Sequence, residues 1–220
     1  MRLGQRLYNT IFPPRFELSP LEQQLLAAMY PNVHWERVEF NRQLPWFLHY
    51  SFAIGVALPD AYNRSLVHVH LRQLEQLQLS ERWCILVHEA FHVQQYYDLQ
   101  SLERRGWGWG YNRRFMRYYL GWFFQTLWEG LRREWLSWRQ AQRHAYRQHP
   151  MERTAYWQEG LFRKYLRVFH GRSVADFFAA VPHLVCTHSR VPVAPAWPFH
   201  GLAILLTLLI MLSKPLLDIL

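Results

Sequence analysis

The stretch VHEAFHV, residues 87–93, lies inside an apolar run from about Ser80 to Gln95, and this run predicts an α-helix. Positions four apart lie one above the other on the same face of a helix, so His88 and His92 can present two imidazoles to one metal ion. Two neutral imidazole nitrogens suit Zn²⁺, which takes a third protein ligand and leaves one position for water. The motif therefore predicts one zinc ion per chain.

Glu89 follows the first histidine of the motif and is turned about a quarter of a turn away from it around the helix. A carboxylate there can reach a metal-bound water without being a ligand. Glu89 is therefore predicted to act as general base, while the metal supplies the Lewis acid. The chain has twelve histidines, so chance is one explanation of the motif. Its apolar neighbours favour a true site, because polar groups inside a buried helix need partners.

The length of 220 residues predicts one domain with room for a short appendage. The net charge is +9, and many arginines lie among Trp and Tyr, a mixture typical of nucleic-acid, acidic-partner or membrane surfaces. No nucleic-acid-binding motif accompanies it, so nucleic acid is not the expected partner. Cys84 and Cys186 are expected to be free thiols in a reducing compartment. The N-terminal residues 1–16 lack the apolar core of a signal peptide.

Short polar and apolar patterns predict the elements before and after the metal helix. The sequence Ser19-Pro20-Leu21-Glu22 is a capping box that begins a helix running to about Tyr30. A modest strand is expected at 34–40, and strands at 52–58 and 66–71 are expected to form a hairpin or meander. A short helix is expected at 72–79. The metal helix itself is expected to continue to about Arg105.

The region after the metal helix is rich in glycine and then in aromatic residues. The GWGWG sequence at 106–110 predicts a loop that covers a substrate cleft, touches a membrane or simply connects two helices. Residues 113–147 predict one long helix, bent at Gly121 and Gly130, whose second half is basic. Pro150 begins another helix, and Ser173 caps a short one that ends near residue 182.

The end of the chain has no Asp, Glu, Lys or Arg from Val191 to Ser213. Its clean apolar helix, about 199–212, is shorter than the roughly 20 residues that span a bilayer. We expect the metal-binding domain at 1–185, then a proline-containing linker and hydrophobic anchor at 186–220. The expected location is the inner membrane of a bacterium with the catalytic domain in the cytoplasm. The alternatives are a soluble cytoplasmic protein and a tail docked on the domain or on a partner; the oligomeric state stays open.

Two sequences together resemble the small zincin-like metallopeptidase domains of bacteria, of the gluzincin type. Those domains pair an H-E-x-x-H-V-x-Q helix with an N-P-x-E-x-x-A helix after a long aromatic helix. Here the sequences are HEAFHVQQ at 88–95 and HPMERTA at 149–155, and the resemblance covers about 19–160. His149 replaces the usual asparagine, a change expected to weaken the helix cap. The resemblance implies an α+β, predominantly helical fold with a small antiparallel sheet, an active-site helix and a second ligand helix.

The resemblance also implies peptide-bond hydrolysis by a zinc-activated water. It makes Glu152 the third ligand beside His88 and His92, and the substrate a polypeptide. The strand at 52–58 is either the edge to which an extended substrate adds or a structural strand. Candidates for stabilising the transition state are Tyr156, Tyr111 and His149. Two other readings stay open: a zinc-binding scaffold of the same fold without turnover, and a membrane-surface adaptor whose motif is accidental.

Asp98 competes with Glu152 for the third ligand position, because metzincins place a ligand ten residues after the first histidine. That arrangement needs glycine where this chain has Gln95, so the helix should continue and carry Asp98 off the ligand face. Glu152 lies in the first turn after Pro150, where the helix dipole favours a carboxylate, and the small Ala155 follows one turn later. The alternative for Glu152 is a capping role alone.

Overall fold

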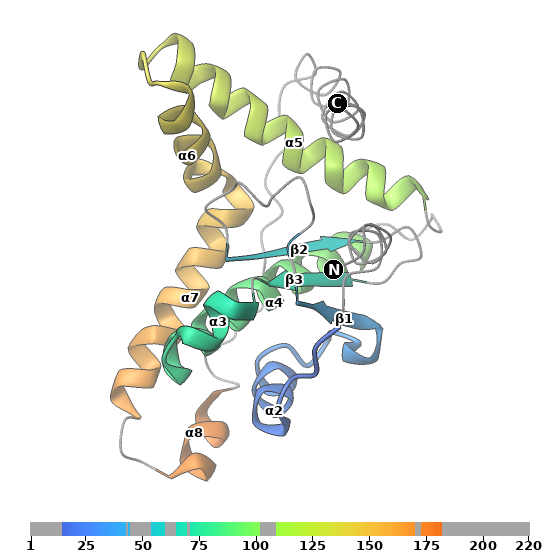
Figure 1. The fold of residues 1–220 in the computed structure, drawn as a ribbon. Coiled ribbons are helices and arrows are strands. Elements are labelled where there is room, and N and C mark those ends of the chain that lie inside the picture. Colours follow the sequence, from blue (N-terminus) through green and yellow to red (C-terminus); the bar gives the residue numbers. More distant parts are fainter. Residues whose placement is uncertain are drawn as a thin grey trace, which may run out of the picture. The chain divides into compact units, whose positions relative to one another are not determined.

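The computed structural model describes the residues 15–42, 44, 54–59, 65–69, 71–101, 109–169 and 173–181. Most of them are helical, which confirms the prediction of a predominantly helical chain (Figure 1). Their contacts form two compact units, one of 15–101 with 155–181 and one of 109–154. The limit between the units, at 154 and 155, falls inside one continuous helix. The expected linker and anchor at 186–220 lie outside the described residues.

Helix α2, Pro20–Met29, begins at the capping box that the sequence predicted. The Ser19 side chain accepts a hydrogen bond from the Glu22 amide, and the Glu22 carboxylate accepts one from the Ser19 amide at 2.9 Å. The same carboxylate is buried against Arg82, whose Nε and Nη2 donate to its two oxygens at 2.6 and 3.1 Å. One glutamate therefore both starts α2 and ties it to the metal helix.

The sheet has three strands in the order β1-β3-β2: β1 is Val38–Asn41, β2 is Gly55–Pro59 and β3 is Ser65–Val69. Strands β2 and β3 pair antiparallel, as a hairpin requires, but β1 pairs parallel with β3. The sheet is therefore mixed rather than antiparallel. The first half of the strand expected at 34–40 is a 3₁₀ turn, η1, Trp35–Arg37.

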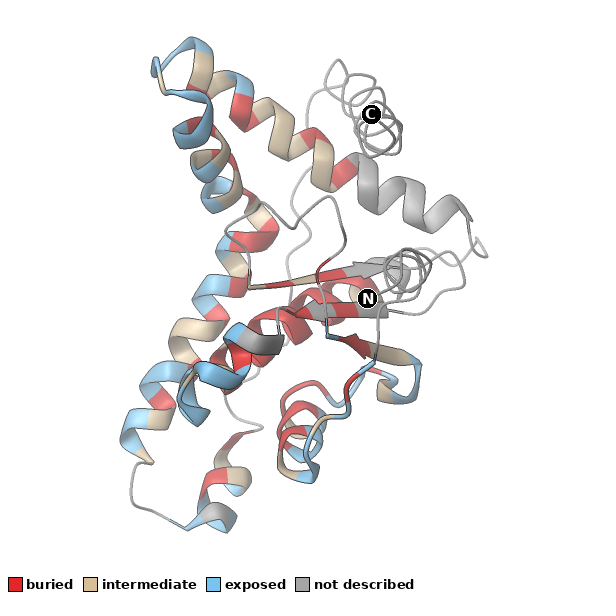
Figure 2. Cartoon of the chain, in the orientation of Figure 1, coloured by how far each residue is buried: buried red, intermediate tan, exposed pale blue. Residues whose placement is uncertain are grey.

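Helix α4, Leu79–Ser101, is the buried centre of the first unit and follows a short helix α3, Leu71–Gln76. It packs against α2, β2 and β3, and Figure 2 shows its middle in the colour of buried residues. Tyrosine hydroxyls fix it to its neighbours: Tyr30 donates to the carbonyl of Val87 at 3.0 Å, and Tyr96 donates to the carbonyl of Ala57. A helix buried on several sides can present polar groups inward only where other groups receive them.

Helix α7, Pro150–Val168, starts at the predicted proline and runs through Gly160 without a break. Helix α8, Val174–Ala180, is capped by the side chain of Ser173, as expected. Aromatic rings join α8 to its neighbours in the first unit, because Phe177 lies 5.7 Å from Trp83 of α4 and 6.2 Å from Phe162 of α7, measured between ring centroids.

The long helix expected at 113–147 is in fact two helices, α5, Trp109–Arg132, and α6, Trp138–Gln148. Helix α5 continues through Gly121 and Gly130, and the break comes at Trp135, whose φ is 54°. The two helices form a hairpin whose interior includes buried Leu127, Ala141 and Ala145. Small residues on α6 let the helices approach, so packing rather than helix propensity decides where the chain turns back.

Among the helices of the described residues, none combines the length and apolar content needed to cross a membrane. The apolar stretch from Val191 to Ser213 and residues 106–108 of the glycine-rich loop lie outside the described part of the chain, so the predictions made for them stay predictions.

Candidate metal centre

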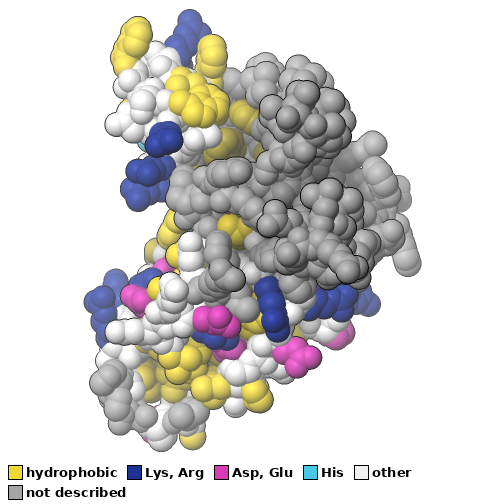
Figure 3. All heavy atoms as spheres, in the orientation of Figure 1, with side chains coloured by type: hydrophobic (Ala, Val, Ile, Leu, Met, Phe, Trp, Pro, Cys, Tyr) yellow, Lys and Arg dark blue, Asp and Glu magenta, His cyan; other side chains and the backbone are white. Residues whose placement is uncertain are grey.

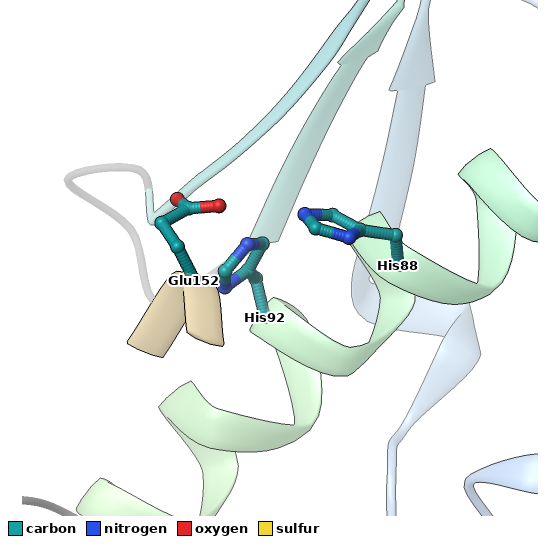
Figure 4. A group of neighbouring side chains, drawn as sticks. All are labelled: His88, His92 and Glu152. Carbon is teal, nitrogen blue, oxygen red and sulfur yellow. The ribbon is translucent and has the colours of Figure 1, made fainter. Parts of the chain in front are cut away.

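Three predicted ligands come together in the structure. Side-chain ligand atoms of His88, His92 and Glu152 all lie within 4.8 Å of one another, and all three residues are buried. Figure 4 shows the two imidazoles projecting from the same side of α4, with the carboxylate from the start of α7 facing them. Two imidazoles and a carboxylate at this spacing form a group that could hold a metal ion.

Hydrogen bonds fix the orientation of both imidazoles. Nδ1 of His88 lies 3.1 Å from a carboxylate oxygen of Glu159, and Nδ1 of His92 lies 2.8 Å from the amide oxygen of Gln95. An oxygen acceptor at Nδ1 keeps the proton on that nitrogen, so the Nε2 lone pair of each ring is available to a metal ion. Such partners of metal-binding histidines also keep the rings from rotating.

Glu159 is itself held by a cation. The Arg163 guanidinium, one turn further along α7, donates to Glu159 Oε1 from Nε at 3.0 Å and from Nη2 at 2.8 Å. Burial disfavours the charged form of Glu159, but the hydrogen bonds from His88 and Arg163 outweigh it and hold the pKa of this carboxyl below its ordinary value. His88 therefore faces a carboxylate, which makes its imidazole a more basic donor for a metal.

The Glu152 carboxylate is held by Tyr119 of α5, whose hydroxyl donates a hydrogen bond to Glu152 Oε1 at 2.6 Å. His149 lies beside this pair, with its ring stacked on that of Tyr119 at a centroid distance of 4.1 Å. Its Nδ1 accepts a hydrogen bond from the amide of Met151 at 3.2 Å, and its Nε2 donates to the carbonyl of Tyr119 at 3.1 Å. The histidine therefore caps α7 with its side chain, and the expected weakening relative to asparagine stays a prediction.

Glu89 is buried on α4 but is not part of the three-residue group. It lies against strand β2: a Cβ atom added to Gly55 would be 2.6 Å from Glu89 Oε1 and 2.8 Å from its Cδ. Those distances are well inside van der Waals contact, so a larger residue at 55 would force the Glu89 side chain or β2 to shift. The glutamate between the two histidines is therefore held beside an end of β2.

The three candidate stabilisers of a transition state lie in different surroundings. Tyr156, one turn after Glu152, places its ring 4.7 Å from that of His88 and is 45% exposed. His149 is fully buried with both ring nitrogens engaged, which makes it a structural residue. Tyr111 is in α5, but its side chain is not among those that the structure describes. Geometry therefore favours Tyr156.

Asp98 is not in the candidate metal group that the described residues form. Helix α4 continues through Gln95 to Ser101, as the absence of glycine at 95 predicted. The Asp98 carboxylate instead accepts a hydrogen bond from Gln94 Nε2 at 2.6 Å, one turn earlier on the same helix.

Sequence reasoning missed Gln95, Glu159 and Tyr119 as partners of the three donors. Helical spacing carries a signal for the first two: Gln95 is three residues after His92, and Glu159 is seven after Glu152, which places it on the same face of α7. Tyr119 is 33 residues from Glu152 and one of many aromatic residues in its helix, so no local pattern distinguishes it.

Comparison with known proteins adds no assignment to this geometry. No protein-family model, no curated protein and no solved structure matches the chain.

Proposed function

We propose that this chain is a zinc-dependent peptidase that hydrolyses peptide bonds at the His88, His92 and Glu152 group. The observation that carries the proposal is the convergence of these three buried donors, with Glu89 on the same helix and outside the group. The resemblance to gluzincins supports the same conclusion, since those domains use two histidines of one helix and a glutamate of a second.

The donor set fits Zn²⁺ better than the hard cations Mg²⁺ and Ca²⁺. Those ions prefer shells made of oxygen, whereas this group offers two imidazole nitrogens and one carboxylate. Three protein donors are also the usual number for a catalytic zinc, because a structural site closes its fourth position with another Cys or His. When bound, the zinc would act as a Lewis acid and lower the pKa of a coordinated water.

Glu89 would take the proton from the attacking water and later give it to the leaving amine. Its carboxylate is buried and lies against Gly55 of β2, which limits how far it can move toward the strand. A positioned base of this kind contributes typically about 10²- to 10⁴-fold to a rate. Tyr156, next to His88, would donate a hydrogen bond to the oxygen that becomes negative.

Strand β2 would bind the substrate as an added strand. In the described part of the sheet it pairs with β3 on one side and stands at the end of the order β1-β3-β2. An edge strand offers backbone donors and acceptors to an extended peptide. Because Gly55 of this strand touches Glu89, a peptide along β2 would run past the general base.

The test has two parts on the full-length chain. Metal analysis after purification without chelators should find close to one zinc per chain, and a peptide-library assay should detect cleavage that a chelator abolishes and added zinc restores. Absence of bound zinc would overturn the metal site. Bound zinc without cleavage of any library member would overturn the peptidase proposal and leave a zinc-binding scaffold.

A further inference from the structure

The turn between α5 and α6 carries an unusual group of exposed side chains. Trp135 is 88% exposed, Trp138 is 57% exposed and Trp128 is 50% exposed. These three residues, with the exposed Arg133 and Arg139, are called the hairpin-turn surface below. Tryptophan side chains are usually mostly buried. Three exposed tryptophans around one turn therefore indicate an interaction site.

The backbone conformation of Trp135 adds an unfavourable free energy to this arrangement. Its φ of 54° is in the left-handed region, which glycine or asparagine occupies more easily than an aromatic residue. The buried core that joins α5 to α6 consists of Leu127, Ala141 and Ala145 and does not include Trp135. The Trp135 side chain is 88% exposed, so packing within the chain does not account for this strain.

The charge around the turn has one sign. Between residues 132 and 147 there are five arginines and one glutamate, so the net charge is +4 with histidine neutral. Arg139, Arg143 and Arg147 are exposed on the face of α6 opposite the buried alanines, and α6 has no acidic residue. Figure 3 shows hydrophobic and basic side chains together around this turn. The lone Glu134 lies 3.7 Å from the imidazole of His144.

We propose that the hairpin-turn surface docks on an anionic lipid membrane, with Trp135 and Trp138 among the headgroups and the arginines against lipid phosphates. Tryptophan prefers the membrane interface, where its ring is apolar and its N–H stays wet. Basic residues beside it gain from the negative surface potential of an anionic leaflet. Rings at the end of a helical hairpin can enter a soft interface, whereas bases of single-stranded nucleic acid stack along a groove. This proposal does not depend on peptidase activity.

Binding of the full-length chain to vesicles tests the aromatic part. Trp135→Gly is expected to weaken binding to vesicles of phosphatidylcholine with phosphatidylserine on the order of tenfold, because a large apolar ring leaves the interface. The same change should raise the melting temperature, since glycine relieves the left-handed strain. The opposite signs separate docking from a structural role. Trp157→Ala, on α7, is the control and should leave binding unchanged, since this tryptophan is 54% exposed, about as much as Trp138.

The arginines are tested by a charge-matched pair of double variants. Arg133→Gln with Arg139→Gln should weaken binding to the anionic vesicles by about fivefold per charge and leave binding to pure phosphatidylcholine unchanged. Lys164→Gln with Arg167→Gln removes the same charge from exposed positions on α7 and is the control.

Three results would overturn the proposal. The first is equal binding of wild type to anionic and neutral vesicles. The second is a loss in the control variants as large as in the hairpin-turn variants. The third is a single-stranded oligonucleotide that binds the wild type more tightly than vesicles do and whose binding the Trp135 change weakens. That last result would assign the surface to nucleic acid instead.

Discussion

Replacing Gly55 by alanine tests how Glu89, the proposed general base, is positioned. The added Cβ would lie 2.6 Å from Glu89 Oε1, while relaxed contacts are about 3.5 Å or more, so the carboxylate or β2 must move by about 0.9 Å. A displacement of about 1 Å at a catalytic group can cost on the order of 10²-fold. We therefore expect Gly55→Ala to lower kcat/KM about 100-fold.

Zinc content separates this effect from a general loss of structure. Glu89 is outside the three-residue group, so Gly55→Ala should keep close to one zinc per chain. Overpacking should lower the free energy of unfolding by about 1–3 kcal/mol, measured by denaturant titration. Gly160→Ala is the matched control: nothing lies within 4 Å of its added Cβ, and alanine favours a helix by about 1 kcal/mol.

Two results for Gly55→Ala would contradict this expectation. Hydrolysis by Gly55→Ala at the wild-type rate, with zinc bound, would show that the distance between Gly55 and Glu89 does not limit the reaction. Loss of zinc together with activity would show that the strand supports the metal group itself, and Glu89 could then not be separated from the ligands.

Four further predictions concern single side chains. Glu89→Gln should keep zinc, by metal analysis, and lose hydrolysis by about 10²- to 10⁴-fold; loss of zinc would make Glu89 a ligand. Glu152→Ala should lose zinc while Asp98→Ala keeps it, and the reverse result would exclude the gluzincin arrangement. Tyr119→Phe should weaken zinc affinity about 10- to 100-fold in a chelator competition, with an unchanged circular dichroism spectrum. Burial raises the pKa of the Cys84 thiol from 9.0 to about 11, so in the folded chain it should resist alkylation near pH 8, followed by mass spectrometry. The same shift stabilises the folded chain below pH 9, and that contribution is lost as the pH rises toward 11.

Elements with a local signal were predicted well from the sequence. A helix begins at the capping box at Ser19, at the proline at 150 and at the cap at Ser173. The serine side chains accept hydrogen bonds from the first amides of their helices, and proline has no amide proton that would need a partner there. The end of α5 was not predicted, because the turn at Trp135 has no glycine and depends on contacts between α5 and α6. The parallel pairing of β1 with β3 was missed for a similar reason, since strand order depends on contacts distant in sequence.

The candidate metal group was likewise predicted only in part from the sequence. The histidine spacing on one helix follows from helix geometry, and the structure places both rings on one side of α4. Glu152 needed a second helix, which the proline and the resemblance together indicated. The partners that orient these donors were not predicted, because a hydrogen bond such as that from Tyr119 joins residues whose spacing has no period.

The position of Glu152 depends on the residue at which α7 begins. A shift of one residue in that start would rotate a first-turn side chain by about 100° and move it about 1.5 Å along the axis. Pro150 and the His149 cap on the Met151 amide fix the start. The same imidazole donates from its other nitrogen to the carbonyl of Tyr119, whose hydroxyl holds the Glu152 carboxylate. One residue of α5 thus holds both the helix start and the ligand within it, and a histidine can link them because its ring has an acceptor on one side and a donor on the other. His149 is therefore part of how this chain positions its third candidate donor.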